Sequence, residues 1–496
     1  MSQLPGLTAA QSLLEQLWTR VGLPAQALDS VTLSGPELSM PSSFNVTALA
    51  QATIAVCALA ASHIDRIRST STSVDNDTPW RQLKVDSRDA SAEFRVERLA
   101  TIGGRQGQVW DKLAGTYRAR AKGWLRPHVN WAHHRLALLD MLGLPQDTMK
   151  IQLAKRFLEC DAFEISERAL SKGLLLTALR SFDEDNSNHG LMSKKDSASR
   201  GPIRIDKLDN QLPKPFPPLV EKCKPLEGIR VLDMTRVIAG PTAGRTLAVT
   251  AEHLPALPEL DFETSRGKRT IQLDLRPENR TDRVKFEQLV QTADVILQAY
   301  RPGALEGLGY GEQQLRQINP DIVYASLNAW GHEGLWKHRR GFDSLVQFAS
   351  GINEAEGQAW KQVEANADNE FEPKALPCQA LDHAAGYLLA FGVQTALARR
   401  AEQGGSYKVT TSLLDVAYLL RSLGRVEPTQ RAFNVEVETL QDLSKRAQTM
   451  QFEHGFDHKA IETVRHAAKV DGLDLNVPFV ATSYHDAEAV WLTRAD

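Results

Sequence analysis

Apolar residues recur at helical spacing in four stretches of the first half of the chain. These are residues 9–18, 46–67, 134–142 and 162–179. An apolar residue at every third or fourth position is typical of a helix with one buried face. We therefore predict four helices here, with short strands between some of them.

After residue 228 the pattern changes to short apolar strands that alternate with helical segments. Strands are expected at 229–234, 269–275, 293–300 and 321–328, and helices at 278–292 and 311–318. A glycine-containing turn, IAGPTAG, follows the first strand. Alternation of this kind is typical of βαβ units with right-handed crossovers. We predict an α/β fold built on a doubly wound parallel sheet.

Between the two patterns lies a stretch, residues 185–227, in which proline, serine, asparagine and lysine replace the apolar periodicity. Such a composition is typical of a linker. A chain of 496 residues also exceeds the size of one hydrophobic core. We predict a first unit at 1–184, the linker at 185–227, a domain at 228–425 and a helical remnant at 426–496.

A weak repeat crosses the linker. Residues 42–61, SSFNVTALAQATIAVCALAA, followed by LKVDSRDASAEF, are similar to residues 379–398, QALDHAAGYLLAFGVQTALA, followed by YKVTTSLLDVAYLL. In this alignment Asn45 takes the place of Asp382, so only the second copy carries a carboxylate. We therefore expect the chemistry to reside after the linker.

Composition argues against several classes of function. The chain has 58 Lys and Arg against 61 Asp and Glu, so no excess of positive charge is available to follow a nucleic acid or an anionic membrane. The four cysteines have no C-x-x-C spacing, and the chain contains no run of about 18 apolar residues. We expect a cytoplasmic protein without a nucleic-acid or membrane partner.

Other motifs have a simple structural interpretation. The adjacent His133 and His134 would point about 100° apart on a helix, with no carboxylate or histidine four positions on, so no metal site is predicted. The turn and the basic residues Lys268, Arg276 and Arg301 near strand ends are compatible with phosphate binding. Taken singly, a tight turn and a solvated charged rim explain them more simply. No G-x-S-x-G motif of a serine hydrolase is present.

Asp382 opens the apolar stretch QALDHAAGYLLAFG and has two interpretations. Aspartate is among the best N-cap residues, and the following residues predict the helix that it would cap. The same position also suits a nucleophile, because the helix dipole favours an ionised carboxylate there. An ionised carboxylate can attack a thioester and form a covalent intermediate. The two roles are compatible with each other.

Five ordered stretches after the linker resemble the class III CoA-transferase family, the CaiB/BaiF group that includes formyl-CoA transferase, carnitine CoA-transferase and α-methylacyl-CoA racemase. They are GIRVLDMTRVIAGPTAGRTLA, SRGKRTIQLDLR, ADVILQAYRPGALEGLG, PDIVYASLNAWG and RRGFDSLVQFASG. The resemblance implies a Rossmann-like large domain and a smaller α+β domain. The N-terminal half resembles the family's small domain, which implies a partial unit fused ahead of a nearly complete one.

The resemblance also implies residue roles and partners. The family's catalytic aspartate falls on Asp382, which would carry an aspartyl-CoA thioester while CoA moves from an acyl-CoA donor to a carboxylic acid acceptor. Coenzyme A is then a substrate, and no tightly bound cofactor or metal is implied. A homodimer is implied, unless the N-terminal half completes the fold within one chain. The implied CoA contacts are Ile238, Ala239, Leu273, Arg276, Ala299, Tyr300, Arg301, Arg340, Gly341, Phe342 and Asp343.

Two departures from the family pattern bear on the reaction. After GRTLA the chain runs VTAEHLPALPELD, so the second strand of the sheet is expected to be shortened or lost. The racemase branch has a histidine where this chain has Phe342, and phenylalanine cannot carry a proton. CoA transfer is therefore favoured. An acyl-CoA racemase or epimerase and an inactive CoA-binding or partner protein are the alternatives.

Overall fold

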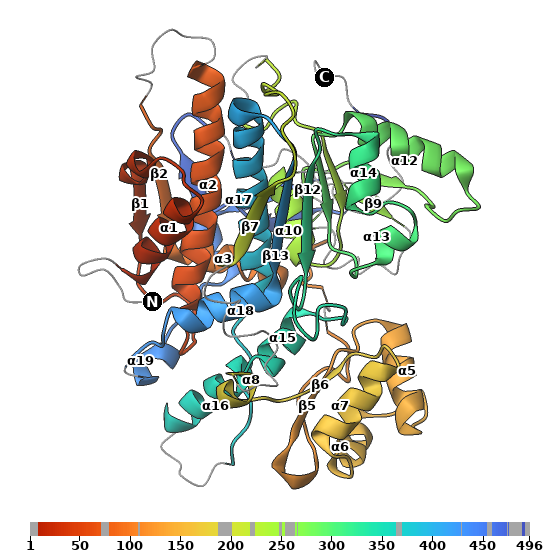
Figure 1. Cartoon of the computed structure of the whole chain (residues 1–496). Coiled ribbons are helices and arrows are strands. Elements are labelled where there is room, and N and C mark those ends of the chain that lie inside the picture. Colours follow the sequence, from red (N-terminus) through yellow and green to blue (C-terminus); the bar gives the residue numbers. More distant parts are fainter. Residues whose placement is uncertain are drawn as a thin grey trace.

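The computed structural model describes residues 8–70, 79–107, 110–186, 201–218, 224–247, 250–252, 263–264, 266–363, 370–427, 429–453, 459–473, 475 and 489–491. Its centre is a seven-stranded sheet with the strand order β10-β9-β8-β11-β12-β13-β7 (Figure 1). Neighbouring strands are parallel, except that β7 is antiparallel to β13. The strands are β7 (Ile203–Lys207), β8 (Val231–Met234), β9 (Thr250–Glu252), β10 (Thr270–Gln272), β11 (Val295–Gln298), β12 (Val323–Asn328) and β13 (Tyr407–Ser412). The mixed α/β architecture with a parallel sheet is confirmed.

Alternate residues of the central strands serve two hydrophobic cores. Val231 and Val295 belong to one core, and their neighbours Leu232 and Ile296 belong to the other. Successive side chains of a strand point to opposite faces, so helices cover both faces of the sheet (Figure 1). The helices that follow these strands are α10 (Ala239–Leu247), α12 (Arg280–Thr292), α13 (Ala304–Gly307), α14 (Glu312–Ile318), α15 (Asp343–Ala349), α16 (Ile352–Val363), α17 (Ala380–Gln403) and α18 (Leu413–Ser422).

Helix α17 is buried along most of its length and lies close to α10. A Cβ atom on Gly386 would lie 2.6 Å from the carbonyl oxygen of Ala239, so only glycine permits this approach. The close packing leaves the first turn of α17 little freedom to move, because the interior of a protein is as dense as an organic crystal. That turn carries Asp382.

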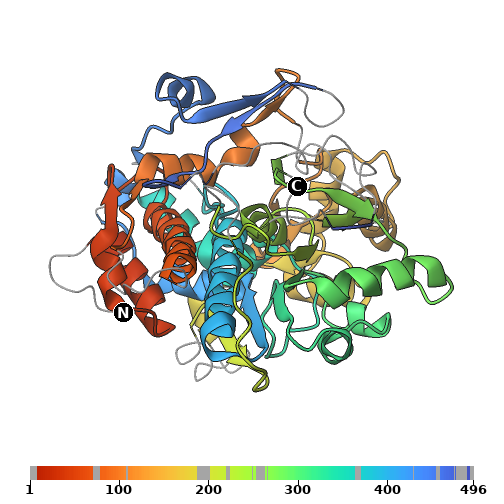
Figure 2. The same ribbon diagram turned by 90° about the horizontal axis from the view of Figure 1, so that it is seen from above.

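The N-terminal region packs its longest helix against α17. It contains α1 (Ala9–Arg20), η1 (Ala25–Ser30), β1 (Val31–Ser34), α2 (Val46–Thr70), β2 (Leu83–Asp86), α3 (Ser87–Glu93), α4 (Val96–Leu99) and β3 (Thr101–Ile102). Figure 2 shows α2 beside α17 when the molecule is seen from above, and their residues share one core. Over Val46–Ser69, α2 is long and apolar enough to cross a bilayer, but that stretch is wholly buried inside the molecule, as in a core helix.

The repeat found in the sequence has a counterpart in the structure. In each copy a long helix leads to a strand and then to a second helix: α2, β2 and α3 in the first, α17, β13 and α18 in the second. The expected equivalence of Asn45 and Asp382 is wrong by about one helical turn. Asn45 precedes α2 and donates a hydrogen bond to the carbonyl oxygen of Leu423 (2.9 Å), whereas Asp382 is the third residue of α17.

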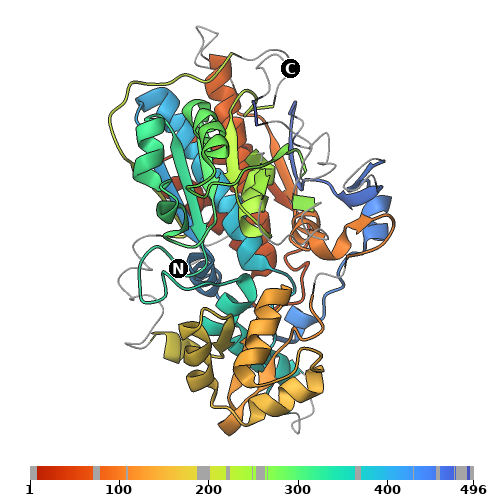
Figure 3. The ribbon, with the colours of Figure 1, turned by 90° about the vertical axis from the view of Figure 1, so that its right-hand side faces the viewer.

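A small lobe lies beyond the carboxyl ends of the sheet and has its own core (Figure 3). It consists of β4 (Tyr117–Arg118), η2 (Arg120–Lys122), β5 (Trp124–Pro127), α5 (Ala132–Leu142), α6 (Lys150–Leu158), α7 (Ala162–Ser171) and β6 (Leu176–Ala178), and α8 (Phe182–Asn186) follows it. The helix predicted at 162–179 is therefore too long. Gly173, in the left-handed region with φ 70°, follows the end of α7 and allows the chain to turn into β6.

The predicted linker contains regular structure. Residues 203–207 form β7, because Ile203 and Ile205 alternate with polar residues and pack on the core at the free edge of β13. The proline- and lysine-rich flanks concealed this short strand. Residues 187–200 and 219–223 of the predicted linker lie outside the described residues.

The predicted C-terminal helical remnant contributes strands instead. Besides α19 (Thr429–Phe433) and α20 (Leu440–Lys445), it forms β14 (Thr449–Phe452), β15 (Ile461–Val464) and β16 (Ala468–Val470). Strand β15 pairs with β3 and β16 pairs with β2, so the two ends of the chain share two small sheets. Residues 454–458, 476–488 and 492–496 lie outside the described part.

A buried charge cluster joins these segments. Glu93 of α3 accepts hydrogen bonds from Tyr387 (2.6 Å) and Arg245 (3.1 Å) and lies 3.0 Å from the ring nitrogen of His466. Arg245 also pairs with Glu263 at 2.6 Å. These side chains come from α3, α10, α17, the segment that carries Glu263 and the connection between β15 and β16, so the cluster holds distant segments in one arrangement.

Candidate active site

Asp382 lies in the first turn of α17, but it does not cap the helix. Gln379 is the N-cap residue and makes no capping hydrogen bond. The cap is supplied by Asp343, whose Oδ2 accepts hydrogen bonds from the backbone N–H groups of Leu381 (2.9 Å) and Asp382 (3.2 Å). The expectation that Asp382 caps α17 is therefore wrong, because a carboxylate from α15 occupies that place.

The two carboxyl groups occupy a buried environment. Asp343 is 2% exposed and Asp382 is 7% exposed. Burial raises the pKa of Asp382 well above its usual range, and the nearby Asp343 and Glu97 raise it further. Burial likewise raises the pKa of Asp343 to about 7, although its hydrogen bonds oppose the shift. The expected effect of the helix dipole, an ionised Asp382, is outweighed by burial and by like charge.

The hydrogen bonds of the pair are unequal. Asp343 Oδ1 accepts a 2.5 Å hydrogen bond from the side-chain amide of Gln347, so both of its oxygens are engaged. Among the described residues none donates a hydrogen bond to the Asp382 carboxylate. Next to it, His383 pairs with Glu97 at 3.0 Å and stacks on Phe94, which fixes the side of α17 that faces the N-terminal region. Asp343 is thus held in place while the carboxylate of Asp382 is available for chemistry.

A cavity of about 830 Å³ opens between the carboxyl ends of the sheet strands and the small lobe. Eight of the eleven predicted CoA-contacting residues line it: Leu273, Arg276, Ala299, Tyr300, Arg301, Arg340, Gly341 and Phe342. The other three do not. Ile238 and Ala239 are buried at the start of α10, and Asp343 faces a second, smaller cavity.

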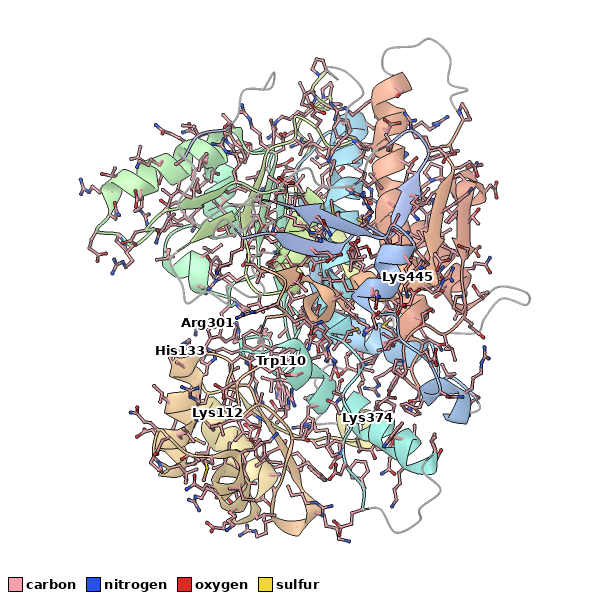
Figure 4. All side chains as sticks on the ribbon, turned by 180° about the vertical axis from the view of Figure 1, so that it is seen from behind. Trp110, Lys112, His133, Arg301, Lys374 and Lys445 are labelled. Atoms are coloured by element: carbon pink, nitrogen blue, oxygen red, sulfur yellow. The ribbon has the colours of Figure 1, made fainter. Side chains whose placement is uncertain are left out.

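Basic side chains surround the large cavity. Arg236, Arg301, Arg340 and His133 all line it, and burial together with the charge of Arg301 lowers the pKa of Arg340. In Figure 4, Arg301 of the sheet lobe and His133 of the small lobe lie across the junction between the two lobes. The three arginines favour an anionic ligand. Lys268, expected near a phosphate, is instead buried in a 2.9 Å ion pair with Asp233.

Nothing in the sequence identified the small-lobe wall of this cavity. Trp131 and His134 line it opposite the sheet. Val237 also lines it, in the turn that joins β8 to α10, with φ 75°. A β-branched residue in this left-handed region is strained. No local signal in the sequence predicts such a conformation.

Phe342 separates the large cavity from a half-buried histidine. The ring of His128 stacks on Phe342 with centroids 3.9 Å apart, and Trp131 packs against the same ring at 5.0 Å. Burial and the nearby Arg126 lower the pKa of His128 to about 3, so its ring is neutral. A histidine therefore lies beside the position that a histidine occupies in the racemase branch.

No metal site is apparent in the described part of the chain, where no three His, Cys, Asp or Glu side chains gather in a suitable cluster. His133 and His134 lie with ring centroids 4.1 Å apart, tilted by 58°. They belong to the wall of the large cavity. The two histidines therefore lie beside a ligand-sized cavity that is also lined by arginine side chains.

Part of the second half of the chain is similar to a known family. Residues 261–442 match the model of CoA-transferase family III. The matched segment includes both Asp343 and Asp382.

Individual relatives are similar over part of their length. The chain is 33% identical over 226 residues to the probable fatty acyl-CoA transferase Rv3272 of Mycobacterium tuberculosis, covering 41% of this chain and 54% of the relative. It is 28% identical over 218 residues to the succinate–glutarate CoA-transferase of Agrobacterium fabrum, covering 39% of this chain and 52% of the relative. The crystal structure of Rv3272 in its orthorhombic form matches with 32% identity and a TM-score of 0.35, over 40% of this chain and 57% of that one. The chain spans about half the length of these relatives.

Proposed function

We propose that the protein transfers coenzyme A from an acyl-CoA to a carboxylic acid, with Asp382 as the nucleophile. The observation that carries the proposal is the position of Asp382 in the family III segment. It is a buried carboxylate with no hydrogen bond from the described residues, and it adjoins Asp343, which directly follows the cavity residues Gly341 and Phe342. The relatives named CoA-transferases support the same reaction class.

The large cavity would hold coenzyme A. Its Arg276, Arg301 and Arg340 would bind phosphate groups, because guanidinium groups form paired, charge-assisted hydrogen bonds with phosphate. Arg276 is 75% exposed and paired with Asp274, so it would lie at the outer end of the ligand. Apolar residues such as Leu273 and Phe342 would contact the uncharged part. Ile238 and Ala239 are buried at the start of α10 and would support the preceding cavity residue Val237.

The proposed reaction proceeds through two anhydrides and one thioester. The Asp382 carboxylate attacks the donor thioester carbonyl, which expels CoA thiolate and leaves an acyl-aspartyl anhydride. The thiolate attacks the aspartyl carbonyl, which releases the donor acid and forms aspartyl-CoA. The acceptor carboxylate then attacks the carbonyl of aspartyl-CoA, which expels CoA thiolate and leaves an anhydride between the acceptor and Asp382. The thiolate finally attacks the acceptor carbonyl of this anhydride, which forms the new acyl-CoA and restores the Asp382 carboxylate.

Asp343 would position Asp382 in this reaction. It holds the first backbone N–H groups of α17 and so fixes the carboxylate that follows them. Its charge also keeps the pKa of Asp382 raised. Since the attack requires an ionised Asp382, the rate is expected to rise with pH.

We also propose that the sheet is of the Rossmann-like type. Numbered along the chain, with β8 as strand 1 and β13 as strand 6, the six parallel strands lie in the order 3-2-1-4-5-6 across the sheet. This is the Rossmann strand order, which supports the proposal. The second strand, expected to be shortened or lost, is represented by three-residue β9. We further propose that the protein is cytoplasmic and forms a homodimer.

The test is exchange of labelled CoA between acids by the wild type, Asp382→Asn and Asp382→Ala. Both variants are expected to lose exchange, and only the wild type should yield an aspartyl-CoA adduct at residue 382, detectable by mass spectrometry after trapping. Asp161→Asn is the matched control, because Asp161 is a half-buried carboxylate that caps α7 in the small lobe. An active Asp382→Asn enzyme would refute the nucleophile. CoA binding without exchange by the wild type would support the inactive CoA-binding protein.

A racemase or epimerase is the second candidate, and the stack of His128 on Phe342 favours it. Racemisation needs two groups that exchange protons on opposite faces of the α-carbon. Asp382 would be one of the pair, and His128 would be the other once the ring of Phe342, which lies between it and the large cavity, turned aside. Deuterium incorporation at the α-carbon of an acyl-CoA, lost in His128→Gln, would support this candidate, whereas CoA exchange without deuterium incorporation would exclude it.

A further inference from the structure

A second cavity, of about 260 Å³, lies on the other side of the segment that carries Phe342 and Asp343. It is bounded by α4, β5, α15, α16, the residues before α17 and the segment 110–116. Trp110, which lines it, is at the junction of the two lobes in Figure 4. Phe342 lines the large cavity and the next residue, Asp343, lines the small one, so the two cavities adjoin at this segment. Asp343 also accepts a hydrogen bond from the backbone N–H of Asp382, which lines neither cavity.

The acidic groups of this cavity are already paired. Asp111 forms a 2.6 Å ion pair with Arg135 and accepts a hydrogen bond from the backbone of Leu113 (2.8 Å). Asp343 accepts hydrogen bonds from two backbone N–H groups of α17 and from Gln347. Neither carboxylate forms an ion pair with Arg98 or Arg126.

The basic groups of the cavity have no such partners. The Nε atom of Arg126 is buried without a hydrogen-bond partner, and none of the described residues forms an ion pair with this guanidinium. Burial lowers the pKa of Arg126, which the charge of Asp343 partly opposes. The exposed Arg98 also lines the cavity, and no described side chain pairs with it. A buried, unpaired cation is costly, so this arrangement favours an anion.

The size and lining of the cavity limit the ligand. A volume of about 260 Å³ is just below the range of about 300–1,000 Å³ typical of small-molecule sites. Besides the two arginines, the lining includes the side-chain amides of Gln347, Asn353 and Gln379. Polar walls of this kind accept a short polar acid and disfavour a long alkyl chain.

Resting on the proposed CoA transfer, we propose that the acceptor is a short dicarboxylic acid and that Arg126, assisted by Arg98, binds its far carboxylate in this cavity. The near carboxylate would then reach the first turn of α17, where Asp382 lies. A monocarboxylic acid of equal length would leave both arginines unpaired. The small cavity would thus select the acid, while the large cavity holds coenzyme A.

The test compares acids of equal carbon number, succinate with butyrate and glutarate with pentanoate, as acceptors for CoA. The wild type is expected to prefer the diacid in kcat/KM. Arg126→Gln should lower kcat/KM for the diacid about 10- to 100-fold, the size expected for charge-assisted hydrogen bonds, and leave the monoacid within about threefold. Arg126→Lys should retain part of the preference. Arg118→Gln, on the neighbouring strand and paired with Glu370, is the matched control and should match the wild type.

Calorimetric titration with succinate and butyrate separates this inference from the proposed reaction. Selective succinate binding that Arg126→Gln abolishes would support the small cavity even if no CoA were transferred. CoA transfer without preference for the diacid, or an equal loss with both acids in Arg126→Gln, would overturn it. If the wild type neither transfers CoA nor binds succinate more tightly than butyrate, the inference also fails.

Discussion

Replacing Asp343 by alanine is expected to loosen the first turn of α17 by about 3 kcal/mol. The substitution removes the acceptor for the backbone N–H groups of Leu381 and Asp382, at 2.9 and 3.2 Å, and for the side-chain amide of Gln347. Leaving a buried donor without a partner costs about 1–3 kcal/mol, and losing an N-cap costs about 1 kcal/mol. Relaxation of the cavity wall and entry of water offset part of the total.

Hydrogen exchange followed by mass spectrometry measures this loosening directly. A loss of about 3 kcal/mol should speed exchange at the start of α17 about 100-fold, while the buried strands of the central sheet keep their protection. Asp382→Ala is the matched control, since no described residue donates a hydrogen bond to that side chain and burial penalises its charge. Unchanged exchange in Asp343→Ala, or equal loosening in Asp382→Ala, would refute the assignment of Asp343 as the cap of α17.

Three further predictions concern titration, a buried ion pair and ligand binding. The pKa of Asp343 is raised to about 7 in the folded protein, so its stabilising contribution is present at low pH and is lost as the pH rises through about 7. The free energy of unfolding in urea should therefore depend less on pH between 4 and 8 in Asp343→Asn than in the wild type. Lys268→Met leaves the buried Asp233 unpaired and should cost about 3–5 kcal/mol in urea unfolding, whereas breaking the exposed Lys285 pair should cost less than about 1 kcal/mol. Arg301→Gln should weaken CoA binding about tenfold and reduce its salt dependence in calorimetry, and an unchanged affinity would place coenzyme A elsewhere.

The periodicity of the second half predicted most of its strands and helices, because buried parallel strands and amphipathic helices leave strong local patterns. The antiparallel strand β7 was missed, since only Ile203 and Ile205 identify it within a polar stretch. Pairing of β16 with β2 and of β15 with β3 could not be predicted, because strand partners far apart in sequence carry no local signal.

The candidate site was predicted in part. The resemblance identified eight residues that line the large cavity and both carboxyl groups. It could not show that Asp343 caps α17, because that role depends on how α15 lies against the helix. The isolated Arg126 was also missed, since its significance lies in the absence of a nearby partner among the described residues.

The contacts between the two halves of the chain imply that the backbone need not be continuous for the fold to form. Helix α2 packs on α17, β16 pairs with β2, and Glu93 is bound by side chains from α10, α17 and the C-terminal region. The two halves are therefore joined by extensive noncovalent contacts. A gene divided between codons 187 and 200 should yield two fragments that assemble when coexpressed, which makes the protein suitable for fragment complementation.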